Sequence, residues 1–239
     1  MSDLFANENS SNALETPLAD KMRPQSLDEV IGQKHLFGDE GPLQNMIISG
    51  VFSSIILWGP PGVGKTTIAR LLADNIDRNF QKLIAIFKSV DDLKKVFEAS
   101  KIRRTNGRRT IIFVDEIHRF NKSQQDSFLP FLEDGTITLI GATTENPSFE
   151  LNPAILSRVQ VLVLERLNNT DLLQLLERAE SVLGSQINLE MDAKTELLKI
   201  ADGDGRTLLN LIENIISWEI SNPLTVKDLS VRLSKRLKR

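Results

Sequence analysis

The chain's 239 residues, of which 41% are hydrophobic and 26% charged, are typical of a globular protein and suffice for one large domain or two small ones. The absence of cysteine excludes disulfides, zinc fingers and thiol catalysis, and two histidines are too few for a histidine-based metal site. The net charge of −3 does not indicate a nucleic-acid-binding protein, so any surface of that kind must be local.

The N-terminal region is polar and acidic. It lacks the basic and then apolar pattern of a signal peptide, and no apolar run in the chain approaches the roughly 20 residues that span a bilayer. We therefore expect a cytoplasmic protein without a membrane partner. Residues 1–16 are rich in Asn, Ser and Glu, which predicts a flexible arm, although Leu4-Phe5 could serve as a short docking motif.

The segment after this arm contains local start and stop signals. Ser26 and Glu29 have the spacing of a helix-capping box, and Gly32 ends the stretch. Leu43 to Val51 predicts a short helix. Residues 54–58, which are mostly apolar, then predict a buried strand.

A glycine-rich stretch with the spacing G-x-x-x-x-G-K-[ST] follows that strand: Gly59, Pro60, Pro61, Gly62, Val63, Gly64, Lys65 and Thr66. Thr67 opens a predicted helix that runs to Ala73. This context is typical of a phosphate-binding loop, in which backbone N–H groups and the helix dipole attract an anion. Lys65 would reach the β- and γ-phosphates of a nucleotide, and Thr66 would bind Mg²⁺. The alternative is an ordinary glycine-rich turn.

A second strand is expected at Leu83 to Phe87, and a helix at Asp91 to Ser100. The segment from Lys101 to Arg109 then contains five basic residues and an Asn-Gly turn. Two interpretations of this basic segment stay open, a solvated loop and a contact with nucleic acid.

An apolar run, Thr110 to Val114, ends in two carboxylates, Asp115 and Glu116. The run predicts a buried parallel strand, and ligands of such sheets bind at the carboxyl ends of the strands. Asp115 would hold Mg²⁺ through a water. Glu116 would act as general base on an attacking water, or orient it.

Helices and strands continue to alternate up to Arg166. We expect a helix at Asn121 to Glu133, a strand at Thr138 to Ala142, a short helix at Pro153 to Arg158 and a strand at Val159 to Leu164. The polar residues Thr143 and Thr144 would lie between the two carboxylates and the γ-phosphate. Five strands alternating with helices predict an α/β fold with a parallel sheet flanked by helices.

Only helices are expected after Arg166, at Thr170 to Leu183, Asp192 to Ala201, Arg206 to Ile220 and Val226 to Lys238. They predict a second, all-helical domain. Thr225 and Asp228 resemble a capping box. Arg206 could face solvent or touch a γ-phosphate, and Arg158 could cap its own helix or reach a neighbouring subunit's site as an arginine finger.

Taken together, these motifs resemble the AAA+ ATPases: the phosphate-binding loop, DEIH at 115–118, GATTEN at 141–146, the Ser157-Arg158 pair and GDGR at 203–206. The string from Asp115 to Arg158 closely resembles the replication-associated recombination protein A family, whose eukaryotic relative is the Werner helicase-interacting protein. Residues 17–36 are similar to the first part of that family's ATPase region. The likeness covers nearly all of the chain from Pro17 onward.

The resemblance implies a role for each matched position. Residues 59–66 would be the Walker A motif, with Asp115 and Glu116 as Walker B, Thr144 as sensor 1, Arg158 as arginine finger and Arg206 as sensor 2. Residues 22–32, which include Ile31 and Gly32, would lie near the adenine. A P-loop α/β core would span residues 17–166 and a helical lid residues 167–239, with ATP and Mg²⁺ bound at their junction.

Members of the family are DNA-dependent ATPases that act at stalled forks, single-strand gaps and duplex ends, with single-strand-binding protein and recombination factors. Three alternatives stay open: a clamp-loader or branch-migration subunit, a protein-unfolding ATPase, and an ATP-binding module with poor turnover. Full-length members continue with a helical domain that makes tetramers. We therefore expect a fragment or shortened product, which puts self-association in doubt. Ile84 also departs from the family pattern.

Overall fold

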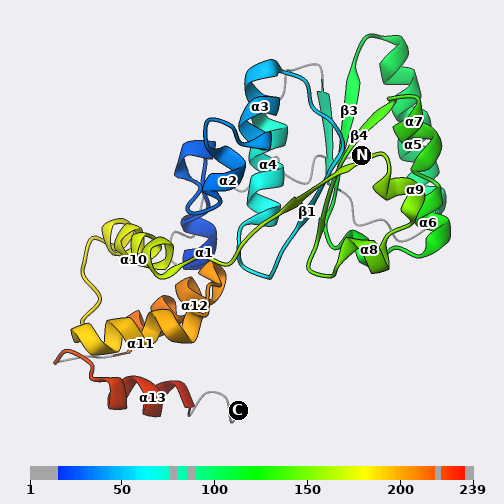
Figure 1. Cartoon of the computed structure of the whole chain (residues 1–239). Coiled ribbons are helices and arrows are strands. Elements are labelled where there is room, and N and C mark those ends of the chain that lie inside the picture. Colours follow the sequence, from blue (N-terminus) through cyan, green and yellow to red (C-terminus); the bar gives the residue numbers. More distant parts are fainter. Residues whose placement is uncertain (1–15, 76–79, 85–89, 219–221, 235–239) are drawn as a thin grey trace.

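The computed structural model describes residues 16–75, 80–84, 90–218 and 222–234 (Figure 1). Its sheet has five strands, all paired in parallel, in the spatial order β2-β3-β4-β1-β5. The strands are β1 (Ile55–Trp58), β2 (Phe80–Ile84), β3 (Arg109–Val114), β4 (Ile137–Thr143) and β5 (Gln160–Val163). The predicted α/β class and its five-stranded parallel sheet are confirmed.

Alternate residues of a strand point to opposite sides of a sheet, and β1, β3 and β4 are buried on both sides along most of their length. Ile55, Leu57 and Ile111 pack with α3 (Pro42–Ser49) and α4 (Lys65–Asn75) on one face. The opposite face carries the neighbouring strand residues, Ile56 and Ile112 among them, and packs with α5 (Val90–Thr105) and the segment after β3. Figure 1 shows these two helical layers on either side of the sheet.

The strand order brings the motifs of the sequence to one edge. β4 lies between β1 and β3, with Trp58 opposite Thr143 and Val114 opposite Gly141. The phosphate-binding loop after β1, the carboxylates after β3 and the threonines at the end of β4 therefore leave the sheet side by side.

Short helical elements precede β1: α1 (Leu18–Lys21), the 3-10 turn η1 (Leu27–Glu29) and α2 (Lys34–Phe37). Others connect the later strands: the 3-10 turn η2 (Ile117–Arg119), α6 (Lys122–Asp126), α7 (Leu129–Glu133), α8 (Pro147–Glu150) and α9 (Pro153–Leu156). Among the described residues, no helix is long and apolar enough to cross a membrane.

The C-terminal helices are α10 (Asn169–Leu183), α11 (Met191–Ala201), α12 (Gly205–Ile216) and α13 (Val226–Ser234). They share a hydrophobic cluster of their own, which includes Leu176, Leu197 and Ile212. Leu18 of α1 belongs to this cluster, and its backbone N–H donates to Oε1 of Glu213 on α12 over 3.0 Å. The start of the described chain thus packs on its last helices.

The position of the second strand predicted from the sequence is wrong. The prediction gave Leu83 to Phe87, whereas β2 begins at Phe80 and ends at Ile84; residues 85–87 lie outside the described part of the chain. Pairing with β3 sets these bounds, because Phe80 lies opposite Arg109 and Ile84 opposite Phe113. A partner strand so distant in the chain is not visible in local hydrophobicity.

Two helix predictions also need correction. Part of the basic segment is not a loop, because α5 continues to Thr105 before the Asn-Gly turn. The predicted helix from Asn121 to Glu133 is instead two helices, α6 and α7, which break at Ser127 and Phe128. Pro130 explains the break, since proline is tolerated in the first turn of a helix and disfavoured in its interior.

Of the two predicted capping boxes, only the second forms. The Thr225 hydroxyl accepts from the backbone N–H of Asp228 over 3.2 Å, and Asp228 Oδ2 accepts from the N–H of Thr225 over 3.2 Å. Ser26, in contrast, makes no capping hydrogen bond at η1. The Glu29 carboxylate instead accepts from the N–H of Gln25 over 3.1 Å.

Candidate functional site

The glycine-rich loop joins β1 to the first turn of α4. Gly62 and Gly64 have φ of 70° and 95°, in the left-handed region that glycine adopts without steric cost. These angles turn the backbone so that α4 begins at Lys65 and its free N–H groups face the loop. A helix N-terminus of this kind is an anion-binding site.

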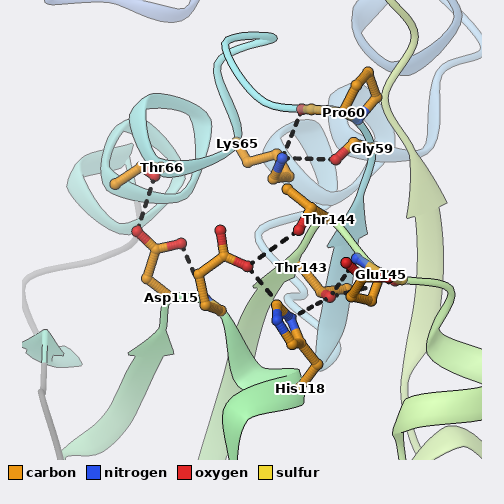
Figure 2. A network of polar contacts seen from close by, with 10 residues as sticks. Gly59, Pro60, Lys65, Thr66, Asp115, His118, Thr143, Thr144 and Glu145 are labelled. Carbon is orange, nitrogen blue, oxygen red and sulfur yellow. Dashed lines mark hydrogen bonds and ion pairs between the residues drawn. The ribbon is translucent and has the colours of Figure 1, made fainter.

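The Lys65 side chain folds back over the loop. Its ammonium donates to the carbonyl oxygens of Gly59 and Pro60, both over 2.7 Å, and the residue is only 7% exposed (Figure 2). Burial lowers the pKa of Lys65, and the carboxylates of Glu116, Asp115 and Asp204 partly oppose that decrease.

The two carboxylates after β3 have different partners. Oδ2 of Asp115 accepts from the Thr66 hydroxyl over 3.2 Å, and its Oδ1 accepts from the backbone N–H of Glu116 over 3.1 Å. Glu116 has φ of 49°, a left-handed conformation that costs a non-glycine residue about 1–3 kcal/mol and is typical of functional sites. Its Oε2 accepts from the Thr144 hydroxyl over a long 3.5 Å.

His118 joins this network from η2. Its Nδ1 lies 2.8 Å from the Thr143 hydroxyl oxygen and 3.3 Å from Oε2 of Glu116 (Figure 2). Thr143, which is fully buried, also accepts from the backbone N–H of Glu145 over 3.0 Å. The sequence contains the signal for this contact, the histidine of DEIH, but no sequence rule gave it a role.

Most of the glycine-rich loop, the carboxylates of Asp115 and Glu116, and Thr144 line a pocket of about 580 Å³ between the sheet edge and the C-terminal helices, whereas His118 and Thr143 lie outside its lining. Of the residues predicted to bind nucleotide or metal or to act in catalysis, it contains Ile31, Pro61, Gly62, Val63, Gly64, Lys65, Thr66, Thr67, Asp115, Glu116, Thr144 and Arg206. Gly59 and Pro60 do not line the pocket and act through their carbonyls on Lys65.

Gly32 lies outside the pocket lining, in contrast to its neighbour Ile31. It has φ of 77°, and a Cβ at this position would lie 2.8 Å from Cδ2 of Leu167. Gly32 therefore packs closely against Leu167, which lines the pocket as Ile31 does, and its predicted place near the adenine stays a prediction.

An ion pair that the sequence did not reveal forms part of the pocket wall. Arg178 of α10 donates to the Glu29 carboxylate over 2.5 Å and to the Glu29 carbonyl over 3.1 Å. Hydrogen bonds from Gln25 and Arg178 hold the pKa of Glu29 below its usual value. The pair fastens the segment after α1 to the C-terminal helices.

The first turn of α12 reaches the glycine-rich loop directly. The backbone N–H of Gly205 donates to the Gly62 carbonyl over 3.2 Å, and Arg206 lines the pocket. Asp204 caps α12 by accepting from the N–H of Thr207 over 2.8 Å. Its carboxylate also lies against Gly62, where an added Cβ would meet Asp204 Oδ1 at 1.7 Å.

Arg158 is a predicted site residue that lies outside this arrangement. It does not line the pocket, and its guanidinium donates to the Ala154 carbonyl over 2.7 Å, to the Ser157 hydroxyl over 2.8 Å and to Glu133 over 2.5 Å. In a single chain, Arg158 therefore bonds the preceding helix α9 and the end of α7.

The oxygen atoms at the pocket fit Mg²⁺. This ion prefers hard oxygen ligands and keeps several waters, so it needs only one or two protein groups. Thr66 and Asp115, with their oxygens 3.2 Å apart, offer a hydroxyl and a carboxylate of that kind. Within the described ranges, no group of three or more His, Cys, Asp or Glu side chains could hold a metal ion, so Mg²⁺ at this site would keep waters among its ligands.

Comparison with known proteins agrees with this geometry. Residues 55–167 match the model of the ATPase family associated with various cellular activities (AAA), so the fold is that of an AAA ATPase. Among solved structures, the chain is similar to Thermotoga maritima RuvB, a Holliday junction branch migration motor, with a TM-score of 0.64 and 29% identity over 80% of this chain and 64% of that one.

Individual relatives indicate a narrower family within the AAA ATPases. The chain is 48% identical over 209 residues to replication-associated recombination protein A of Coxiella burnetii, covering 85% of this chain and 47% of that protein. It is 46% identical over 202 residues to the Escherichia coli (strain K12) protein of the same name, covering 82% and 45%. ATPase WRNIP1 of Dictyostelium discoideum is 42% identical over 204 residues, covering 84% and 23%.

The chain belongs to the replication-associated recombination protein A family, as its sequence motifs predict. It spans about half the length of the replication-associated recombination proteins it matches.

Proposed function

We propose that the pocket binds ATP with Mg²⁺ and hydrolyses it. One observation carries the proposal: the phosphate-loop lysine, the two strand-end carboxylates, Thr144 and Arg206 converge on a single pocket although they come from distant parts of the chain. Such convergence of an anion-binding helix terminus with carboxylates is what phosphoryl transfer requires.

Different groups of the chain bind the phosphates and the metal ion. The N–H groups at the start of α4 and the Lys65 ammonium face the phosphates, while Thr66 and Asp115 hold the metal. Mg²⁺ bound there would neutralise charge on the phosphate oxygens. Gly59 and Pro60 accept two of the three hydrogen bonds that the Lys65 ammonium can donate, which leaves one donor for a phosphate.

Hydrolysis is an in-line attack by water that Glu116 activates or orients. Thr144, which shares a hydrogen bond with Glu116, orients the same water. Arg206 approaches the γ-phosphate from α12. Arg158, which is remote from its own pocket, acts on the nucleotide of a neighbouring subunit, so full activity needs self-association.

We propose further that hydrolysis drives remodelling of single-stranded, gapped or forked DNA during replication and recombination, with single-strand-binding protein and recombination factors as partners. The support is the name shared by the bacterial relatives. Branch migration is a second candidate, which the likeness to RuvB favours. Remodelling of forks in preference to four-way junctions would separate the first candidate from the second.

Two substitutions test the hydrolytic site. Lys65→Ala should weaken ATP binding about tenfold or more, whereas Glu116→Gln should keep ATP bound and stop turnover. Glu177→Gln, an exposed carboxylate on α10 outside the pocket, is the matched control. Turnover by Glu116→Gln at the parental rate would refute the role given to Glu116.

The dependence of ATPase activity on protein concentration, with and without gapped DNA, tests assembly. DNA-stimulated activity that rises more than linearly with concentration supports a role for Arg158 in trans. Activity that is strictly linear and unaffected by DNA would contradict both the DNA coupling and the shared site in this chain.

A further inference from the structure

His118 contacts two groups of the pocket network through a single ring nitrogen. Nδ1 lies 2.8 Å from Oγ1 of Thr143 and 3.3 Å from Oε2 of Glu116. The side chain is 16% exposed and is held in η2, directly after the left-handed turn at Glu116. Neither contact belongs to the roles proposed above.

The surroundings decide which ring nitrogen carries the proton. An unprotonated Nδ1 would direct its lone pair at the Glu116 carboxylate, which is an acceptor only. A protonated Nδ1 instead donates to Thr143 and is shared with Glu116. Thr143 then accepts from His118 and from the N–H of Glu145, and donates its own proton to the Glu145 carbonyl over 3.3 Å. Protonation at Nδ1 therefore gives Thr143 one donated and two accepted hydrogen bonds, and it keeps the Nδ1 lone pair from facing the Glu116 carboxylate.

The other histidine of the chain is an internal reference. Nε2 of His35 lies 2.8 Å from the carbonyl oxygen of Val163, which can only accept, so His35 carries its proton on Nε2. The two histidines therefore have opposite tautomers when both rings are neutral.

We propose that His118 is a positioning residue for Glu116, which it ties through Nδ1–H to Thr143 and thus to the end of β4. The inference rests on the proposed role of Glu116 in hydrolysis. Without His118, the hydrogen bond that remains to Oε2 of Glu116 among those described is the 3.5 Å contact with Thr144, which is at the limit for a hydrogen bond. The carboxylate then samples other rotamers, and fewer of them orient water.

The tautomers can be measured without any turnover. Nitrogen NMR of histidine-labelled protein, at a pH at which both rings are neutral, should show a protonated Nδ1 for one ring and a protonated Nε2 for the other. The variant His35→Gln removes one set of signals and so assigns His118. Protonation of His118 at Nε2 would overturn the proposal whether or not the chain hydrolyses ATP.

Kinetic measurements test whether the loss of His118 slows hydrolysis. His118→Ala should lower kcat at least about tenfold, a part of the 10²–10⁴-fold that a general base contributes, while KM and the Kd for ATP change little. His118→Asn, which can place an amide N–H near the position of Nδ1, should recover part of the rate. In a Glu116→Gln background, His118→Ala should have no further effect.

Other outcomes are informative. An equal loss of rate in the Glu116→Gln background, or a Kd that weakens as much as kcat falls, would mean that His118 acts on the fold or on binding and not through Glu116. A parental chain that binds ATP but never hydrolyses it would refute the proposed function, and the tautomer measurement would still decide the contact. If His118→Ala does not fold, Thr143→Val removes the same link from its other end and should lower kcat in the same way.

Discussion

Gly62→Ala should disturb both the phosphate-binding loop and the N-terminal cap of α12. A Cβ on Gly62 would lie 1.7 Å from Oδ1 and 2.2 Å from Cγ of Asp204, distances that no real structure tolerates. The Asp204 side chain must rotate away, and it then leaves the N–H of Thr207 without its acceptor. The substitution therefore acts on two elements that are 142 positions apart in the chain.

Two contributions set the expected decrease in the free energy of unfolding. The left-handed φ of 70° costs alanine roughly 1–2 kcal/mol. Loss of an aspartate N-cap costs about 1 kcal/mol more. Gly62→Ala should therefore reduce the free energy of unfolding by roughly 2–3 kcal/mol, and Asp204→Ala alone by about 1 kcal/mol.

The double variant is the decisive measurement. The atoms that an added Cβ meets at Gly62 all lie beyond Cβ of Asp204, so Asp204→Ala removes them. The cap can be lost only once, so the double variant should be about 1 kcal/mol more stable than the sum of the single effects predicts. Urea unfolding followed by circular dichroism gives each value.

Gly184→Ala is the matched control. Gly184 has φ of 68° and ends α10, but an added Cβ there meets nothing within 4 Å. It should report the backbone cost alone. If Gly62→Ala destabilises no more than Gly184→Ala, or if the effects of Gly62→Ala and Asp204→Ala are additive, the contact between Gly62 and Asp204 does not couple the loop to the cap of α12.

Three further predictions concern the nucleotide pocket. Since burial lowers the pKa of Lys65, ATP affinity should fall with rising pH in a range below that of an ordinary lysine, as calorimetric titration can show, and Lys65→Ala should abolish this dependence. Asp204→Asn keeps an N-cap residue but removes a negative charge beside the loop, so it should tighten ATP binding by up to about tenfold, whereas Asp192→Asn on the exposed face of α11 should not. Arg158→Ala should leave the ATP affinity of the single chain unchanged, because its guanidinium bonds Glu133 outside the pocket; a tenfold loss in the same titration would contradict that placement.

Motifs with local spacing could be predicted from the sequence because their physics is local. Gly62 and Gly64 have left-handed backbone angles that favour glycine, and the apolar runs before Gly59 and Asp115 specify buried strands. Connecting each strand end to the same pocket needed only the rule that ligands bind at the carboxyl ends of a parallel sheet.

Contacts between distant segments could not be predicted in this way. Glu29 has a capping-box partner three residues away, yet it bonds Arg178, which lies 149 positions further along. Asp204 could be identified in the GDGR string, but its contact with Gly62 depends on how α12 packs against the loop. The bounds of β2 depend likewise on its register with β3. Each result is set by tertiary packing, which overrides local preference.

Because its wall is shared, the pocket links nucleotide binding to the C-terminal helices. The Gly62 carbonyl bonds Gly205, Arg206 lines the pocket, and Leu18 fastens α1 to Glu213 on the same helix. A ligand shifts a conformational equilibrium only through contacts that differ between the states. Arg206 is the charged group that α12 adds to the pocket. We therefore expect the loss of a γ-phosphate to change the position of α12 mainly through Arg206. The contact between Gly62 and Asp204 would then transmit this change to the loop, and its loss in Gly62→Ala should weaken that coupling as well as the fold.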